Sequence, residues 1–203
     1  MKSNKVILGI HGADTEVHQC DHIAYFWENE QQFKDAVGFL QTGIRSEDHC
    51  VVFGYEEANE KVLQVLREQK VNVEQLIAQR RLSVLTAELT GDATLQNIRQ
   101  TFQKALDAGA PMIRLLGNIG WHRPKWPNEL DILAFEAKVT TAARAFPCVI
   151  VCMYDVNALP GKVIMRGGLE THPVTIRGNV IRENPFYVSV EKFIEDLEKE
   201  KSS

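Results

Sequence analysis

Three histidines and a cysteine lie near the amino terminus, and all four side chains are of types that bind transition metals. The stretch "HGADTEVHQCDH" contains His11, His18, Cys20 and His22, and imidazole and thiolate groups are common zinc ligands. On an extended segment, alternate residues face the same way but lie ~7 Å apart, too far to share one ion unless the backbone bends. Spacing alone therefore does not predict a metal site here.

Two further cysteines, Cys148 and Cys152, share one face of an expected strand. Four positions along a strand correspond to ~13 Å, so the two thiols could neither ligate one ion nor form a disulfide. The chain shows no secretory signal, and cysteines in such chains are usually reduced. We expect buried free thiols that pack as small hydrophobic side chains.

Polar and aromatic residues gather where three of the expected strands end. Ligands of open α/β sheets lie outside the carboxyl ends of the strands, so these residues are pocket candidates by position. Solvated loop starts, with aromatic rings covering the edge of the sheet, would give the same pattern. No Ser/His/Asp or Cys/His arrangement can be identified from the spacing. The residues are Tyr55, Glu56, Asn118, Trp121, Tyr154 and Asp155.

The usual nucleotide-binding motifs are missing from the sequence. Neither GxxxxGK[ST] nor GxGxxG occurs, and the first strand-to-helix turn holds Trp27, Glu28, Asn29 and Glu30 in place of glycines. Without a glycine-rich loop and its lysine, a triphosphate has no cradle, so we do not expect ATP hydrolysis. Asp155 ends "VCMYD" where a Walker B carboxylate could sit, but a strand that simply ends in a polar residue looks the same.

Short apolar stretches alternate with helical patterns, which predicts an α/β fold with a mostly parallel central sheet and helices on both faces. A two-residue Gly178-Asn179 turn in "VTIRGNVIREN" predicts a C-terminal antiparallel hairpin at one edge of the sheet. Caps and breakers are expected at Asn72, Gly109, Pro127 and Ser189. The expected strands are 22–27, 50–55, 82–86, 111–117 and 148–154. The expected helices are 30–44, 58–70, a short one from 72, 92–108, 127–145, a short one within 156–173, and 189–200. The first of these helices has an apolar stripe of Phe33, Ala36, Val37, Leu40 and Ile44.

Composition favours one globular domain over the whole chain, 1–203. Hydrophobic residues make up 44% and charged residues 25% of the 203 residues, which are ordinary values. The net charge of -4 gives no general attraction to nucleic acid or to an anionic membrane. The first apolar run, 6–10, is too short for a signal or a membrane span, so we expect a cytoplasmic protein.

Several short motifs, in order along the chain, resemble the MEDS family, the methanogen and methylotroph sensory domain. "HIAYFWEN", "FLQTGI" and "HCVVFG" resemble its first strand, helix end and second strand, and "IRLLGNIGW", "VCMYD" and "THPVTIRGNVIRENPFY" match later signatures more closely. Such motifs are weak singly but specific when several occur in order. The resemblance covers about Gly9 to Tyr187, a core of 9–187, followed by the 189–200 helix.

Glu136 in "AFEAKVT" stands where the family has a glutamate, and the sequence departs from the family pattern nearby. Phe135 replaces the tyrosine that the family has before this glutamate, which puts a hydroxyl role there in doubt. The stretch 13–21 is extra length before His22, and it makes His11 and His18 poor candidates for an inherited function.

The resemblance implies a fold and a function. The family is regarded as a degenerate relative of the RecA-like ATPases of the circadian-clock type, which implies a three-layer, RecA-like fold without a P-loop. It also implies signal transduction by sensing small hydrocarbon derivatives, with no catalysis and no cofactor. Because the sensor fold uses up the 203 residues, we expect the signal to pass to a protein partner or through a homo-oligomer, without direct contact to nucleic acid or membrane.

Our leading hypothesis is a small-molecule pocket over the strand ends, with His22, Tyr25 and Trp27 expected on one face of the first strand as its first wall. Within it, a buried Arg114–Glu136 pair could be opened by a competing ligand; a purely structural polar network is the alternative. A second hypothesis is a metal-binding protein or enzyme that uses His22, Cys152 and His172. A third is an ATPase-like interaction subunit without a ligand. The proposed ligand-binding residues are His22, Tyr25, Arg114, Asn118, Trp121, Glu136, Cys152, Tyr154 and His172.

Overall fold

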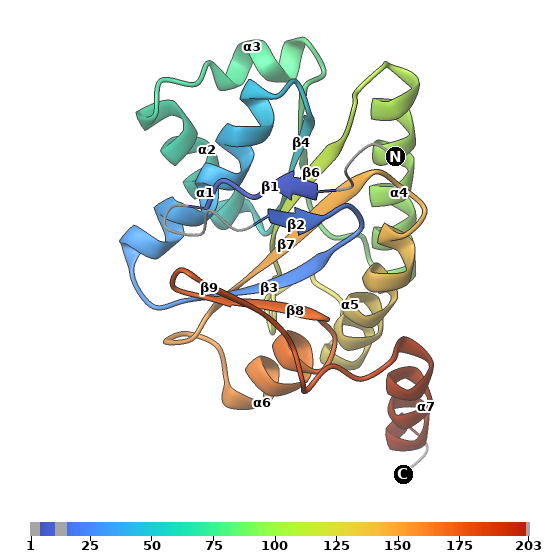
Figure 1. The fold of residues 1–203 in the computed structure, drawn as a ribbon. Coiled ribbons are helices and arrows are strands. Elements are labelled where there is room, and N and C mark those ends of the chain that lie inside the picture. Colours follow the sequence, from blue (N-terminus) through green and yellow to red (C-terminus); the bar gives the residue numbers. More distant parts are fainter. Residues whose placement is uncertain (1–4, 11–15, 202–203) are drawn as a thin grey trace.

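A seven-stranded sheet forms the centre of the molecule (Figure 1). The computed structural model describes residues 5–10 and 16–201. Six of the seven strands are parallel, and the order across the sheet is β5-β4-β6-β7-β3-β8-β9, with β9 antiparallel at one edge. The strands are β3 (His22–Trp27), β4 (His49–Gly54), β5 (Leu82–Leu85), β6 (Ile113–Asn118), β7 (Cys148–Asp155), β8 (Val174–Arg177) and β9 (Val180–Glu183).

Helices cover both faces of this sheet, as the sequence predicts. Figure 1 shows α1, α2 and α3 on one side and α4, α5 and α7 on the other, and side chains of each group pack with one face of the strands. The helices are α1 (Glu30–Arg45), α2 (Glu56–Glu68), α3 (Val73–Ala78), α4 (Gly91–Asp107), α5 (Glu129–Ala143), α6 (Gly161–Val163) with the π-helical segment η1 (Ile164–Leu169), and α7 (Val190–Lys201).

Most of the predicted helix signals act as expected. Asn72 caps α3 by accepting a hydrogen bond from the Gln75 N–H, and Gly109 follows α4 with a φ of +92°, a conformation that favours glycine at helix ends. The prediction for Pro127 is wrong by two residues. Asn128 is the N-cap of α5, so Pro127 precedes the cap and does not occupy the first turn.

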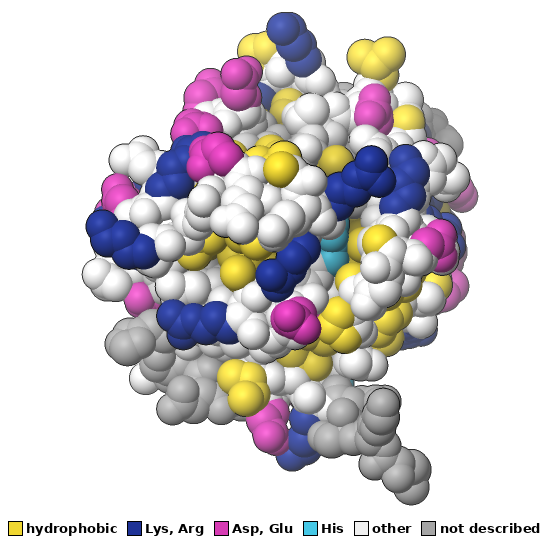
Figure 2. All heavy atoms as spheres, turned by 90° about the horizontal axis from the view of Figure 1, so that it is seen from above, with side chains coloured by type: hydrophobic (Ala, Val, Ile, Leu, Met, Phe, Trp, Pro, Cys, Tyr) yellow, Lys and Arg dark blue, Asp and Glu magenta, His cyan; other side chains and the backbone are white. Residues whose placement is uncertain are grey.

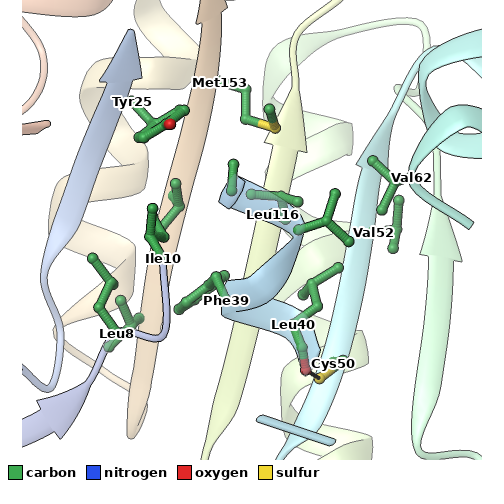
Figure 3. Packing of buried hydrophobic residues seen from close by; sticks show 14 of the residues in the cluster. Leu8, Ile10, Tyr25, Phe39, Leu40, Cys50, Val52, Val62, Leu116 and Met153 are labelled. Atoms are coloured by element: carbon green, nitrogen blue, oxygen red, sulfur yellow. Dashed lines mark hydrogen bonds between the residues drawn. The ribbon is translucent and has the colours of Figure 1, made fainter. Parts of the chain in front are cut away.

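Two hydrophobic cores lie on the two faces of the sheet. On the first face, Phe39 and Leu40 of α1 contact a layer that includes Val52 and Leu116, two strands apart in sequence but adjacent in the sheet (Figure 3). On the second face, α4, α5 and α7 pack over the opposite sides of the same strands. Because neighbouring residues of a strand face opposite ways, each strand contributes to both cores.

Three features were not predicted or differ from prediction. Strands β1 (Lys5–Ile7) and β2 (Glu16–His18) form a separate antiparallel pair. The C-terminal hairpin β8–β9 is present with its two-residue turn, but β8 pairs parallel to β3, and β9 alone runs the other way. Segment η1 is π-helical, where the sequence suggested one short ordinary helix.

Charges of both signs are spread over the surface seen in Figure 2. Lys and Arg side chains alternate there with Asp and Glu side chains, and neither sign covers that face as one continuous patch. Among the described helices, none combines the length and the apolar character needed to cross a membrane.

Candidate functional site

The carboxyl ends of four neighbouring parallel strands form one edge of the sheet. Strands β4, β6, β7 and β3 lie side by side in that order. A crevice of about 290 Å³ opens at this edge, which is the place where open α/β sheets bind ligands. Two larger surface depressions, of about 490 and 760 Å³, are lined mainly by charged and polar side chains of the helices and loops. The crevice walls include Trp27, Phe33, Tyr55, Ile119, Trp121, Met153 and Leu159.

Two of the predicted ligand-binding residues, Asn118 and Trp121, line the crevice. Their side chains are buried, and neither Asn118 Nδ2 nor Trp121 Nε1 has a hydrogen-bond acceptor among the described residues. A buried N–H group without a partner costs on the order of 1–3 kcal/mol. Both nitrogen atoms are enclosed by the protein, so each could donate to an acceptor atom of a bound molecule only after its side chain moves.

Cationic side chains close the rim of the crevice by lying over aromatic rings. The Arg123 guanidinium is 3.6 Å from the centre of the Tyr55 ring, and Lys61 Nζ is 4.2 Å from the centre of the Phe33 ring. Such cation–π contacts are worth about 0.5–1 kcal/mol at exposed sites. Both cations belong to the crevice lining and help to shape its opening.

The place of a phosphate loop, between β3 and α1, is filled by the chain's own polar groups. Asn29 Oδ1 accepts a hydrogen bond from the Gln32 N–H, and Gln32 Oε1 accepts one from the Glu28 N–H. These contacts use backbone donors that would otherwise face an anion at the helix start. Nearby, Asp155 Oδ1 accepts bonds from the Asn157 and Ala158 N–H groups and so closes a turn.

A second constellation, on the α5 side of the sheet, joins four of the predicted residues. His22 from β3, Glu136 from α5, Cys152 from β7 and His172 after η1 are all at most 3% exposed. The His22 Nε2 atom is 3.3 Å from Cys152 Sγ and 3.5 Å from Glu136 Oε2. His172 Nε2 and Cys152 Sγ each lie 3.8 Å from the same Glu136 oxygen. We call these four residues the buried cluster.

Two threonines fix the orientation of the histidine rings. The Thr140 hydroxyl donates to the Thr171 carbonyl oxygen at 3.0 Å, so it accepts from His22 Nδ1–H at 2.9 Å. In the same way, the Thr171 hydroxyl donates to the Gly167 carbonyl oxygen and accepts from His172 Nδ1–H. Both imidazoles therefore carry their proton on Nδ1 and turn the Nε2 lone pair toward the other cluster atoms.

Burial shifts the pKa of every member of the buried cluster in the direction that favours its neutral form. It lowers the pKa of His22 and of His172 to about 3, the latter also through the nearby His22 ring. The same loss of solvent raises the pKa of Glu136 and raises that of the Cys152 thiol well above its usual range. Charge would be costly in this solvent-free place unless it were matched by an opposite charge.

Tyr154 extends the buried cluster. Its hydroxyl lies 3.1 Å from Glu136 Oε1 and 2.7 Å from the Gly167 carbonyl oxygen. A small apolar pocket of about 20 Å³, room for about one water molecule, borders Cys152 between α4, α5 and the sheet. The cluster is therefore linked by side chains to η1 on one side and to an apolar space on the other.

The predicted Arg114–Glu136 ion pair is wrong. Arg114 Nε donates to Asp48 Oδ2 at 2.8 Å, and Arg114 Nη1 donates to the carbonyl oxygens of Ile7 and Leu8. These partners lie on the α1 face of the sheet, whereas Glu136 lies on the α5 face. Arg114 thus ties the β1 segment to the sheet.

The sequence-based placement of His22, Tyr25 and Trp27 on one face is also wrong. Positions 22 and 25 differ by an odd number, so the side chains point to opposite faces. Tyr25 packs on the α1 side and donates its hydroxyl hydrogen to the Gln32 carbonyl oxygen at 3.0 Å. Burial raises its pKa to about 12, and the nearby Asp35 adds to this. Tyr25 therefore supports the start of α1 and lies outside both the crevice and the buried cluster.

The metal ligands considered near the amino terminus do not converge. His18 is exposed on β2, Cys20 is half-buried with its thiol 3.4 Å from the Phe146 carbonyl oxygen, and His22 is buried. His11 lies outside the described residues. Cys148 and Cys152 are free thiols, as expected.

Three residues of these networks were missed from the sequence. Thr140 lies one helical turn after Glu136, so the i, i+4 spacing on α5 could have found it. Thr171 precedes His172 directly, but nothing in sequence shows that it orients the ring. Asp48 carries no local signal for its pairing with Arg114, 66 residues away.

Comparison with known proteins agrees with this architecture. A family model described as "MEthanogen/methylotroph, DcmR Sensory domain" matches residues 21–173, well over half of the chain. The chain belongs to the MEDS family. The range of this MEDS match begins one residue before His22 and ends one residue after His172, so it contains the crevice and the whole buried cluster.

A curated relative carries the same MEDS type of sensory region. The protein named "Transcriptional repressor DcmR" from Methylorubrum extorquens (strain DSM 6343 / CIP 106787 / DM4) is 26% identical over 168 residues. The alignment covers 82% of this MEDS chain and 62% of the repressor, so the chain spans less than two thirds of that relative's length. The two findings support a sensory or signalling role.

Proposed function

We propose that this MEDS chain is a non-catalytic sensory domain that binds a small hydrocarbon derivative in the strand-end crevice. The observation that carries the proposal is the crevice of about 290 Å³, whose walls combine apolar side chains with the charged Glu57, Lys61, Arg123 and Asp155. Its lining also includes Asn118 and Trp121, whose enclosed side-chain N–H groups have no acceptor among the described residues. This volume is near the lower end of known ligand pockets, about 300–1,000 Å³. It suits a molecule of a few heavy atoms.

The lining defines the chemistry of such a ligand. Trp27, Phe33, Met153 and Leu159 favour an apolar body, because burying apolar area contributes roughly 25 cal/mol per Å². The two donors favour one or two acceptor atoms, such as a hydroxyl, carbonyl or halogen. A nucleotide is disfavoured, since the side chains of Gln32 and Asn29 already accept hydrogen bonds from the backbone N–H groups of Glu28 and Gln32 at the turn where a phosphate would bind.

Trp121 gives a route for the signal to leave the crevice. Its six-membered ring packs against Gly167 of η1 so closely that a Cβ built at that glycine would lie 2.6 Å from Trp121 Cζ2. Gly167 also accepts hydrogen bonds from Tyr154 and Thr171. A ligand that shifts Trp121 would therefore shift η1, and a change in η1 would reach the surface at exposed Met165.

The chemistry of the buried cluster supports the non-catalytic part of the proposal. A Cys–His nucleophile needs a thiolate and access to substrate. Here burial raises the pKa of the Cys152 thiol, and the side chains of Glu136 and both histidines are 0% exposed. The Cys152 thiol, paired with a buried histidine, is accordingly a poor nucleophile in this conformation.

We further propose that the MEDS fold is a RecA-like ATPase frame whose phosphate loop has been lost. The mostly parallel sheet with helices on both faces and the capped β3–α1 turn support this kinship. In this proposal, ligand binding is signalled to a protein partner or through a change in a homo-oligomer. Because the relative is named a transcriptional repressor, the process controlled is most simply transcription.

A thermal-shift screen followed by calorimetry tests ligand binding. Small alcohols, halocarbons, carboxylic acids and nucleotides are added in turn, and a ligand at 100 times its Kd should stabilise the protein by about 2.7 kcal/mol. Trp121→Phe, which removes the indole N–H, should weaken the binding, whereas the control Trp126→Phe should not, because Trp126 lies outside the crevice walls. No stabilisation by any compound, together with a stable oligomer in light scattering, would favour an interaction subunit without a ligand.

A further inference from the structure

The donor atoms of the buried cluster have the spacing of a metal coordination shell. His22 Nε2, Glu136 Oε2, Cys152 Sγ and His172 Nε2 belong to a group whose ligand atoms all lie within 4.8 Å of one another. Four of the separations are 3.3, 3.5, 3.8 and 3.8 Å. In a tetrahedral zinc site, bond lengths of about 2.0–2.3 Å place neighbouring ligand atoms about 3.3–3.8 Å apart. These four separations agree with that range, and the other two are at most 4.8 Å, so a bound ion would draw the ligands slightly closer together.

The rings are also turned as metal ligands require. Each imidazole donates its Nδ1–H to a threonine hydroxyl that is itself held by a backbone carbonyl. Nδ1–H donation of this kind fixes the tautomer of metal-binding histidines and leaves Nε2 free to bind. A structural hydrogen-bond network would be expected to use both nitrogens of each ring; the His22 ring does so, with Nε2 bonded to the Cys152 thiol, whereas the His172 ring does not.

One atom shows that the network is incomplete. His172 Nε2 is fully buried and has no hydrogen-bond partner among the described residues. It lies 3.8 Å from Glu136 Oε2, which is too long for a hydrogen bond but normal for two ligands of one ion. The lone pair therefore points into the space that the other three donor atoms surround.

We propose that His22, Glu136, Cys152 and His172 bind one divalent transition metal ion of the zinc class. This site is separate from the strand-end crevice and does not depend on a crevice ligand. Two imidazoles, one thiolate and one carboxylate form a mixed nitrogen, sulfur and oxygen set that suits a tetrahedral ion. All four positions are supplied by the protein, which is the arrangement of a closed, structural site.

Charge balance favours the same conclusion. The ion carries two positive charges; binding breaks the Cys152 S–H bond and the Glu136 O–H bond, and both protons leave to solvent. Thiolate and carboxylate then cancel the charge of the ion, while both histidines stay neutral. A site that is closed to water is thus electroneutral both with and without the metal, which limits the cost of burying the ion.

The proposed ion would connect segments that are far apart in sequence. His22 lies on β3, Glu136 on α5 and Cys152 on β7, and His172 directly follows η1 and its turn. Bound metal would fix the end of η1 against the sheet. We infer that it stabilises the arrangement through which Trp121 contacts Gly167.

Cobalt titration of chelator-treated full chain tests the proposal. We expect one equivalent of Co²⁺ to bind, with visible bands of tetrahedral intensity and a near-ultraviolet thiolate-to-cobalt band, and Zn²⁺ to displace it and raise the Tm. Cys152→Ala should lose the thiolate band. Cys148→Ala, on the same strand and face but bonded to the Ala143 carbonyl oxygen, is the matched control and should keep it.

Thr140→Val adds a variant that leaves all four ligands in place. Loss of the hydroxyl that orients His22 should weaken Co²⁺ binding about 10- to 100-fold, with circular dichroism confirming the fold. Absence of both the cobalt bands and a zinc-dependent Tm rise in the unmodified chain would overturn the proposal, as would a thiolate band that persists in Cys152→Ala. Crevice ligands are assayed separately, so either proposal can fail alone.

Discussion

At the scale of single residues, the two faces of the sheet hold different kinds of buried polar groups. The α1 face holds a charged pair, Arg114 with Asp48, whose side chains are 3% and 5% exposed. The α5 face holds the buried cluster, in which burial shifts the pKa of all four groups toward the neutral form. The first is a fixed structural tie, whereas the second can change its charge state when a cation arrives. The two sites therefore respond differently to mutation.

Breaking the charged pair should destabilise the fold strongly. Asp48→Ala leaves Arg114 buried without its counter-ion, and such a loss costs about 3–5 kcal/mol. Urea unfolding at neutral pH would measure this as a lower free energy of unfolding. Glu57→Ala, which removes an exposed partner of Arg123, is the control and should change stability by at most about 1 kcal/mol. A small effect of Asp48→Ala would show that the pair does not hold the β1 segment.

The buried histidines should make the metal-free protein less stable as the pH falls below about 6.5. Their pKa values are lowered to about 3 in the fold, whereas in the unfolded chain they titrate near 6.5. Below that pH the unfolded chain binds protons that the folded chain does not. Each histidine then lowers stability by on the order of 1 kcal/mol per pH unit until the folded pKa is reached. The raised pKa of Glu136 acts in the opposite direction above its ordinary range.

Comparison of variants isolates this histidine contribution. The free energy of unfolding is measured from pH 7 to pH 4.5 in the presence of a chelator. His172→Gln should reduce the slope by about one proton, and His18→Gln, an exposed position, should leave it unchanged. If the unmodified protein, His172→Gln and His18→Gln all showed the same dependence of unfolding free energy on pH, a neutral buried His172 would be contradicted.

At the scale of elements, segment η1 connects the crevice with the buried cluster. Its two glycines allow close packing, because a Cβ at Gly167 would meet Trp121 at 2.6 Å and a Cβ at Gly168 would meet Phe26 at 2.8 Å. The same segment presents the Gly167 carbonyl oxygen to Tyr154 and Thr171. A movement of η1 would therefore alter both the crevice and the buried cluster.

Gly167→Ala tests this connection. The added methyl group overlaps the Trp121 ring, so we expect a loss of about 1–3 kcal/mol in stability and a changed Trp121 environment in tryptophan fluorescence. Gly161→Ala, at the start of α6, is the matched control. A Cβ there meets no atom within 4 Å, so that variant should be neutral or slightly stabilised. Equal behaviour of the two variants would exclude η1 as the link.

Helices and strands were predictable where the sequence carries a local signal, such as a hydrophobic period, a helix cap or a turn motif. The α1 stripe, the Asn72 cap and the Gly178-Asn179 turn are local signals, and each has the predicted structure. The β1–β2 pair was missed because three-residue strands have no period to detect. A short helix was predicted where α6 and η1 lie, but its π-helical form was not. The pairing of Arg114 was mispredicted because side-chain partners across a sheet depend on which face each residue takes.

The candidate site was predictable to a similar, limited degree. The position of the crevice follows from strand polarity, and Asn118 and Trp121 were placed there correctly. The convergence of His22, Cys152 and His172 was named as an alternative, and the structure brings them together. The separation of the nine predicted residues into a crevice, a cluster and an α1-face network requires three-dimensional coordinates, because it depends on residue parity and topology together.

At the scale of the whole molecule, the MEDS fold combines an open crevice with a closed polar centre. The crevice lies at the strand ends, and the buried cluster lies beneath α5, with Trp121, η1 and Tyr154 between them. Such an arrangement allows a ligand to bias a conformational equilibrium only as far as it binds the two states differently. The central claim is accordingly that a small ligand occupies the crevice.

Nitrogen-15 NMR of the indole N–H groups tests that claim most directly. The chain has three tryptophans; Trp27 and Trp121 line the crevice, while Trp126 does not. On titration with the best compound of the screen, we predict that the Trp121 signal, assigned by Trp121→Phe, shifts strongly, that Trp27 shifts less, and that Trp126 stays in place. A saturating ligand that leaves Trp121 unmoved, or that moves Trp126 alone, would contradict the account.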